Sequence, residues 1–213
     1  MIEVEVWSDF ACPFCAIGKR QFDLALQKYP QKDNVKVTFK SFELDPNSPK
    51  SQTEKITEIL SKKYGQTLEW AQKANERVTK MAADCGMTFH MEKIVPTNSF
   101  DAHRLAHLGA SKGLQTQIQD RLFQAYFTEG KDIAKVEVLA DLGAAAGLSR
   151  DEIHQMLMTD QFIDEVRSDE AEARQLGIQG VPFFIFNRRL GVSGAQPIDV
   201  FLQAFDEALK PAP

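Results

Sequence analysis

Apolar and polar positions at the start of the chain follow two different periods. Residues 2–6 and 35–40 alternate apolar and polar side chains, which is the two-residue period of strands with one covered face. Between them, Phe22, Leu26 and Tyr29 recur at helical spacing. This order predicts a strand–helix–strand unit with parallel strands and a right-handed crossover.

The middle of the chain is predicted to be helical. From Gln52 to Leu176 the apolar residues recur at helical spacing, and no segment has the pattern of a strand. We expect about six or seven helices in this block. Glycines mark the expected breaks between them: Gly65, Gly113, Gly130 and Gly147.

Strand patterns return near the C-terminus. Residues 181–192 contain an apolar run, a turn and a second apolar segment, which predict a hairpin, and residues 198–209 carry the apolar stripe of a last helix. Because strands lie only near the two ends, we predict an α/β protein. Its discontinuous core comprises residues 1–50 and 177–213, and residues 51–176 form a helical insertion.

Charge and composition limit the classes of partner that we expect the protein to bind. The net charge is −5 and both signs are interspersed, which does not favour nucleic acid or an anionic membrane. No stretch reaches membrane-spanning length, and residues 2–6 lack the pattern of a signal peptide. We therefore expect a cytoplasmic protein, in which a close cysteine pair is more often catalytic than structural.

The pair Cys12 and Cys15 lies at the predicted start of the first helix. Pro13 suits the first helical position because it lacks an amide hydrogen, which puts Cys12 at the N-cap. We expect the Cys12 sulfur to accept hydrogen bonds from the amides of Phe14 and Cys15, and the helix dipole to favour its thiolate. Since thiolates attack disulfides and leave from them, the pattern predicts Cys12 as nucleophile and Cys15 as the resolving cysteine.

The same cysteine spacing also occurs in zinc sites, which need further ligands. Cys85 stands alone, and His103 and His107 are not spaced as in a zinc finger. We therefore expect a redox pair and no metal. A non-enzymatic chaperone or zinc-binding module stays as an alternative.

These motifs together resemble one known family. The segment Cys12-Pro13-Phe14-Cys15 after a first strand, the helical insertion, and residues 180–184 before a hairpin resemble the DsbA-like thioredoxin family over nearly the whole chain. Residues 7–10 and 96–104 are similar to its cytoplasmic FrnE-like branch, which is related to the 2-hydroxychromene-2-carboxylate isomerases. The resemblance implies a thioredoxin-like fold with a large all-helical insertion.

The resemblance also implies roles for single residues. In this family the proline before the late strand is cis and lies against the redox pair, which maps onto Pro182, although base rates alone favour a trans bond. The backbone of Val181 is implied to bind an extended substrate. Pro13 and Phe14, between the cysteines, are the further expected substrate contacts.

One position departs from related thioredoxin-like proteins. Many of them carry a buried acid six residues before the first cysteine, where this chain has Val6. The proton acceptor for Cys15 is therefore unassigned. Glu43 and His103 are candidates, and the alternative for each is a surface or packing role.

A polar motif in the helical block also resembles glutathione-using relatives. Asn98, His103 and Arg104 are implied to line a polar ligand pocket. The alternative is that Asn98 caps the next helix and Arg104 pairs with a nearby acid.

The expected function is thiol–disulfide exchange, including disulfide isomerisation, on thiol- or disulfide-containing proteins or small molecules. No bound cofactor is expected, and glutathione is a candidate redox partner. The oligomeric state stays open. The alternative activity is a glutathione-dependent isomerisation of the 2-hydroxychromene-2-carboxylate type, which does not need an enzyme dithiol. The presence of both cysteines favours exchange.

Overall fold

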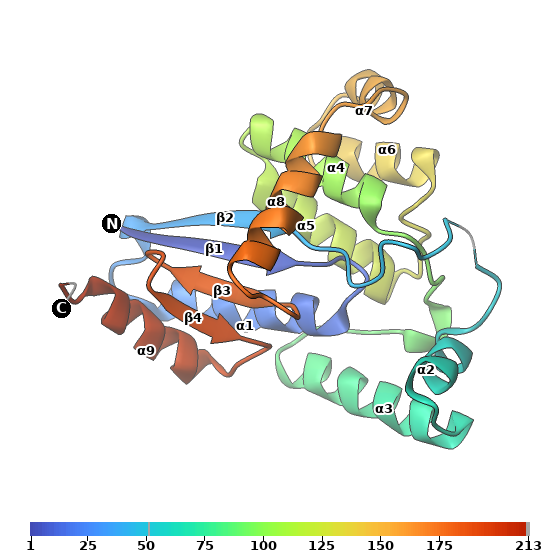
Figure 1. Cartoon of the computed structure of the whole chain (residues 1–213), viewed down its shortest axis with the longest axis horizontal. Helices are drawn as coiled ribbons and strands as arrows, with labels where there is room; N and C mark the ends of the chain where they lie inside the picture. The colour runs from blue at the N-terminus through green and yellow to red at the C-terminus, as the bar shows by residue number, and fades with distance from the viewer. Residues whose placement is uncertain (51, 212–213) are drawn as a thin grey trace. The chain divides into compact units, whose positions relative to one another are not determined.

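The computed structural model describes residues 1–50 and 52–211, and its contacts divide the chain into two units (Figure 1). The first unit comprises Met1–Leu44 and Arg167–Pro213, and the second comprises Asp45–Val166. Both boundaries lie earlier than those expected at residues 50 and 176.

The first unit is built on a four-stranded sheet in the order β2-β1-β3-β4. Strands β1 and β2 are parallel, β3 is antiparallel to β1, and β3 and β4 form the predicted hairpin. Helix α1 connects β1 to β2, as expected for a strand–helix–strand unit. The strands are β1 (Ile2–Ser8), β2 (Val35–Ser41), β3 (Phe183–Phe186) and β4 (Leu190–Ser193).

The alternation along β1 sends its side chains to two different cores. Val4 and Val6 join a cluster that α1 (Pro13–Lys28) and α9 (Ile198–Leu209) complete with aromatic side chains. The Phe22 ring of α1 stacks on Phe184 with centroids 5.4 Å apart. Val6, at the position discussed above, therefore contributes to a hydrophobic core.

Trp7 points to the opposite face of the sheet, which the C-terminal part of α8 (Ile163–Gln175) covers (Figure 1). Its indole N–H donates to the carbonyl of Asp169 at 3.0 Å, and the Asp169 carboxylate accepts the Ser41 amide at 2.9 Å. These bonds tie α8 to β1 and β2. They explain why residues 167–176, expected in the insertion, belong to the unit that contains the sheet.

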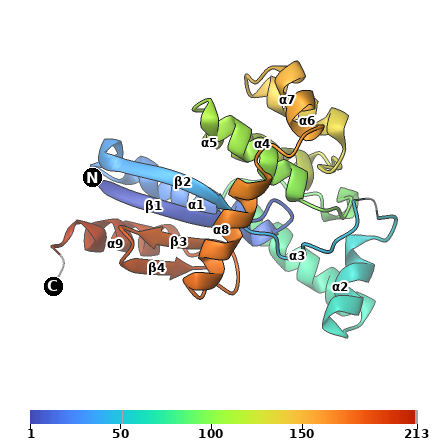
Figure 2. The ribbon, with the colours of Figure 1, turned by 45° about the horizontal axis from the view of Figure 1, so that its top comes forward.

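The second unit is helical, as predicted, and its described residues contain no strand (Figure 2). Helices α2 and α3 pack on each other, and α4 to α7 form a second group. The four glycines expected at breaks all have positive φ. The helices are α2 (Ile56–Tyr64), α3 (Leu68–Asp84), α4 (Phe100–Ser111), α5 (Gln115–Phe123), α6 (Val136–Ala145) and α7 (Arg150–Leu157).

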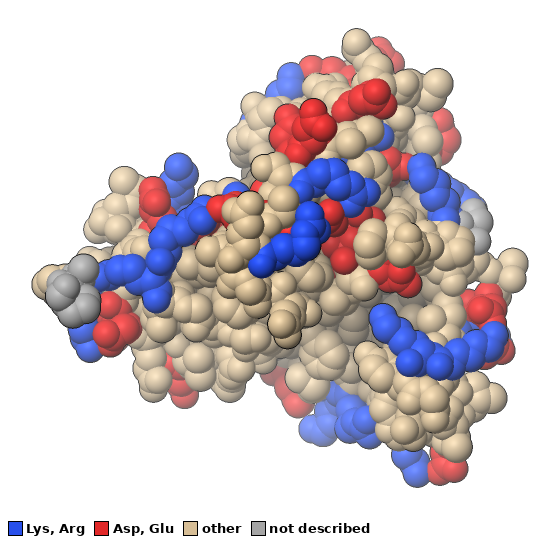
Figure 3. All heavy atoms as spheres, in the orientation of Figure 1, with Lys and Arg blue, Asp and Glu red and all other residues tan. Residues whose placement is uncertain are grey.

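Basic and acidic side chains are interspersed on the face drawn in Figure 3. Part of this mixture is an ion-pair network in the first unit, where Lys40 lies 2.7 Å from Glu172 and 3.3 Å from Asp169. Arg188 pairs with the same Glu172 at 2.6 Å. Within residues 1–50 and 52–211, no helix has the length and apolarity needed to cross a membrane.

Candidate functional site

Cys12 lies at the N-cap of α1, as the sequence predicts. Its backbone is extended, with φ −97° and ψ 115°, and Pro13 begins the helix. The Cys12 carbonyl accepts the Cys15 amide at 3.1 Å, while its own amide donates to the Asp9 carbonyl at 3.1 Å. The chain thus makes a tight turn between β1 and α1 that holds the first cysteine at the helix start, where it is 4% exposed.

The prediction that the Cys12 sulfur caps the helix is wrong. The sulfur accepts no capping hydrogen bond, and the Cys15 amide is used by the Cys12 carbonyl. Both cysteines are thiols in this structure, and the Cys12 thiol donates instead to the Val181 carbonyl, with sulfur and oxygen 3.8 Å apart. A thiol is a weak donor, so this contact can give way to another group.

Cys15 lies one turn further along α1 and is 1% exposed. Burial raises the pKa of the Cys15 thiol well above its ordinary value, and the hydrogen bond to Cys12 and the charge of Cys12 raise that pKa further. The backbone amide of Asp9, which donates to Cys15 Sγ at 3.3 Å, acts in the opposite direction. Cys15 therefore holds its proton at neutral pH.

Pro182 is buried and packs directly against α1. The Val181–Pro182 peptide bond is cis. A Cβ atom added to Gly18 would lie 2.7 Å from Pro182 Cγ, so a larger residue there would force the proline or the helix to move. Gly18 gave no signal in the sequence, because its neighbour is remote along the chain.

The residues expected as substrate contacts are apolar and differ in exposure. Phe14, the second residue between the cysteines, is 41% exposed although it is aromatic. Pro13 and Val181 are half-buried. The structure thus brings all the residues expected as substrate contacts into the first unit, together with both sulfurs.

Asp9 is a residue of the site that the sequence motifs did not predict, and it is 2% exposed. Its two carboxylate oxygens accept the amides of Ala11 at 3.0 Å and Leu44 at 2.8 Å. The signal for Asp9 was its place three residues before Cys12, in the segment similar to the FrnE-like branch.

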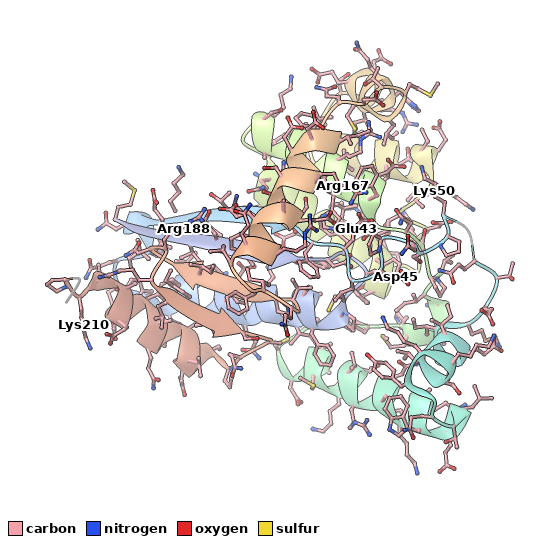
Figure 4. All side chains as sticks on the ribbon, in the orientation of Figure 1. Glu43, Asp45, Lys50, Arg167, Arg188 and Lys210 are labelled. Atoms are coloured by element: carbon pink, nitrogen blue, oxygen red, sulfur yellow. The ribbon has the colours of Figure 1, made fainter. Side chains whose placement is uncertain are left out.

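Neither expected proton acceptor is among the groups that shift the pKa of Cys15. The Glu43 carboxylate lies 2.6 Å from the Arg167 guanidinium, which also binds Glu170 at 2.7 Å (Figure 4). His103 lies on α4 in the second unit and is 2% exposed. The side-chain charges that act most on Cys15 come from Cys12 and Asp9.

Asn98 and Arg104 make contacts within the second unit. The Asn98 side-chain oxygen accepts the Phe100 amide at 2.9 Å, at the start of α4. Arg104 pairs with Asp101 at 3.0 Å and donates to the Gln161 carbonyl at 3.0 Å. Further Arg104 donors reach the carbonyls of Met156 and Thr159. These bonds support the alternative in which the motif caps and fastens helices.

The third cysteine also lies in the second unit. Cys85 ends α3, and its thiol donates to the Ala82 carbonyl at 3.2 Å. Among the residues that the structure describes, no group of three or more histidine, cysteine, aspartate or glutamate side chains could hold a metal ion.

Known proteins share this architecture. A probable DsbA oxidoreductase from Streptomyces coelicolor is 38% identical, with 100% of this chain and 92% of that chain covered and a TM-score of 0.95. Two remoter structures show the fold alone. A cytosolic disulfide reductase, DsbM from Pseudomonas aeruginosa with glutathione, is 17% identical, covers 97% of this chain and 98% of its own, and has a TM-score of 0.67. A 2-hydroxychromene-2-carboxylate isomerase is 14% identical, with 96% and 95% covered and a TM-score of 0.73.

A family model also matches nearly the whole chain. The model of the DSBA-like thioredoxin domain matches residues 3–206, which include both parts of the sheet unit and the helical unit between them. An assignment to the FrnE type fits the same findings. The chain therefore belongs to the DsbA-like thioredoxin family.

Proposed function

We propose that this protein is a thiol–disulfide oxidoreductase in which Cys12 is the nucleophile and Cys15 the resolving cysteine. The observation that carries this proposal is the contrast between the two sulfurs. Cys12 stands at a helix N-terminus, and its thiol makes a weak hydrogen bond to the Val181 carbonyl. Cys15 is buried and protonated one turn away.

The exchange reaction follows from this arrangement. The Cys12 thiolate attacks one sulfur of a substrate disulfide, forms a mixed disulfide, and expels the other sulfur as a thiolate. Cys15 then loses its proton and attacks Cys12 Sγ, and the second substrate sulfur leaves with the electron pair of the broken bond. Two electrons pass from the enzyme dithiol to the substrate, and the reverse sequence oxidises a substrate dithiol.

The surroundings of Cys12 suit an extended polypeptide. The Val181 carbonyl, which now accepts the Cys12 thiol, can accept a substrate amide in strand-like pairing. Phe14, two residues after Cys12, offers exposed apolar surface, and Pro182 follows Val181 directly in the chain. We therefore place protein disulfides or thiols first among substrates, and small thiol compounds second.

Glutathione is the redox partner that fits this scheme without a bound cofactor. The DsbM reductase of the same fold is known with glutathione, and its cytosolic origin agrees with a cytoplasmic location for this protein. Equilibration of the purified dithiol against a glutathione buffer, followed by thiol counting, measures whether the two couples exchange electrons.

The decisive test is reduction of insulin or a model disulfide by the native protein and by Cys12→Ala. The substitution is expected to lower the rate on the order of 10³-fold or more, because the nucleophile is lost. Cys85→Ala is the matched control, since Cys85 lies in the other unit and its removal should leave the rate unchanged. Equal rates for the native protein and Cys12→Ala would remove the proposal.

The fold shared with a 2-hydroxychromene-2-carboxylate isomerase supports a second candidate activity. Such an isomerisation uses the sulfur of glutathione and does not need an enzyme dithiol. Turnover of the chromene substrate by Cys12→Ala/Cys15→Ala with glutathione would establish it, and absence of turnover in the native protein as well would discard it.

A further inference from the structure

Asp9 is bonded to both cysteines of the pair. Its carbonyl accepts the Cys12 amide at 3.1 Å, and its amide donates to Cys15 Sγ at 3.3 Å. Its carboxylate is held by the amides of Ala11 and Leu44. One buried side chain therefore connects the turn before α1 to the segment that follows β2.

We propose that Asp9 is a positioning residue for the resolving step: its carboxylate anchors the turn that aims its amide at Cys15 Sγ, and its negative charge opposes ionisation of that sulfur. This inference rests on the proposed function, because the exchange reaction requires Cys15 to ionise.

The surroundings of Cys15 leave Asp9 as the carboxylate with this influence. Cys12 is the other titratable group that acts on Cys15, and it raises the pKa of Cys15 in the same direction as the Asp9 charge. Glu43, on the segment after β2, is bound by Arg167. Lys19, one turn further along α1, is paired with Asp23 at 2.7 Å. Because Cys15 is buried, salt screens the charges of Cys12 and Asp9 only weakly at this site.

The consequence lies in the second half of the exchange. Cys15 gives its proton to water or a buffer base, its thiolate bonds to Cys12 Sγ, and the bond between Cys12 and the substrate sulfur breaks with the electron pair on the leaving sulfur. The rate at a given pH follows the fraction of Cys15 in the thiolate form. Asp9→Asn removes the charge and keeps the backbone amide that donates to Cys15 Sγ, so it is expected to accelerate resolution at neutral pH.

The first test is the titration of Cys15 in Cys12→Ser, followed through the ¹³Cβ chemical shift of Cys15 with and without Asp9→Asn. The titration is expected to move to lower pH, and each pH unit raises the thiolate fraction about tenfold at a fixed pH below the midpoint. Asp33→Asn removes an equal charge from an exposed position and is expected to leave the curve in place. An unmoved curve in Asp9→Asn, or an equal shift in Glu43→Gln, overturns the inference.

The second test is kinetic and separates positioning from folding. In the otherwise native protein, an aryl thiol joined to Cys12 as a mixed disulfide is released when Cys15 attacks. Asp9→Asn is expected to release it faster at neutral pH with a profile moved to lower pH, whereas slower release with an unchanged profile overturns the inference. If Asp9→Asn does not fold, the ¹³Cγ chemical shift of Asp9 is followed in Cys12→Ser instead. That chemical shift is expected to change at the pH at which Cys15 ionises. A shifted Cys15 titration in a protein without exchange activity removes the proposed function and with it the role in resolution, whereas an unmoved titration in an active protein removes this inference alone.

Discussion

The turn before α1 and the start of α4 each carry a short motif typical of the family, and they use their polar atoms in opposite ways. In the turn, the Cys12 thiol makes a 3.8 Å contact to a carbonyl. In α4, the Arg104 guanidinium pairs with Asp101 and donates to carbonyls of its own unit. In the turn before α1 the motif thus leaves its reactive sulfur weakly bound and available for chemistry. In α4 the motif uses its donors to hold its own unit together.

The first prediction concerns removal of the resolving cysteine. Cys15→Ala is expected to lower steady-state disulfide reduction on the order of 10³-fold, about 4 kcal/mol in activation free energy, because the mixed disulfide on Cys12 is no longer resolved. The same variant should accumulate a Cys12–substrate adduct, which mass spectrometry detects under non-reducing conditions. Normal turnover without an adduct would show that the two sulfurs do not act in sequence.

The second prediction concerns Arg104, whose side chain is 5% exposed. Arg104→Met leaves the Asp101 carboxylate and several carbonyls without this donor, and breaking a buried ion pair typically costs about 3–5 kcal/mol. Urea unfolding measures this loss. Arg150→Met is the matched control, because the ion pairs of Arg150 are exposed, and it should unfold close to the native midpoint. A fully stable Arg104→Met that has lost affinity for glutathione would instead establish the ligand pocket.

The third prediction tests the contact between Pro182 and α1. Gly18→Ala places a methyl group 2.7 Å from Pro182 Cγ, so the proline or the helix must move. Such overpacking costs about 1–3 kcal/mol, and disulfide reduction should fall with it. Gly180→Ala is the control, since nothing lies within 4 Å of a Cβ at that position. Equal stability and activity of the two variants would contradict a tight contact between Pro182 and α1.

The contrast between the two motifs also shows how far sequence reasoning reaches. The strands, the first and last helices and the N-cap position of Cys12 follow from patterns within a few residues, and the structure has them as predicted. The extent of the helical block follows from the same periodicity. Periodicity alone does not tell which unit a helix packs on, however. The end of α8 belongs to the sheet because Asp169 meets Trp7 and Ser41, which are remote in sequence.

The contacts that make the site work are of the same long-range kind. Gly18 matters because Pro182 lies on it, and Asp9 matters because the Leu44 amide holds its carboxylate. Neither pairing follows a helical or strand period. The orientation of the Cys12 sulfur was mispredicted for a related reason, since its partner Val181 arrives from the far end of the chain.

The smallest expected effect is the pH dependence of stability in the reduced protein. Burial raises the pKa of Cys15 in the folded state, so below about pH 8.5 both the folded and unfolded forms are protonated and stability is complete. Above that pH the unfolded form loses a proton that folded Cys15 keeps. The free energy of unfolding should therefore fall by up to about 1.4 kcal/mol per pH unit until the folded pKa is reached.

Urea unfolding at pH 8 and pH 10 should show this extra slope in the reduced native protein. The slope should be absent from Cys15→Ala, in which the remaining thiols are the same. Parallel pH dependences of the two proteins would mean that Cys15 ionises as readily in the fold as in the open chain, and the contrast between the two sulfurs would then have no electrostatic basis.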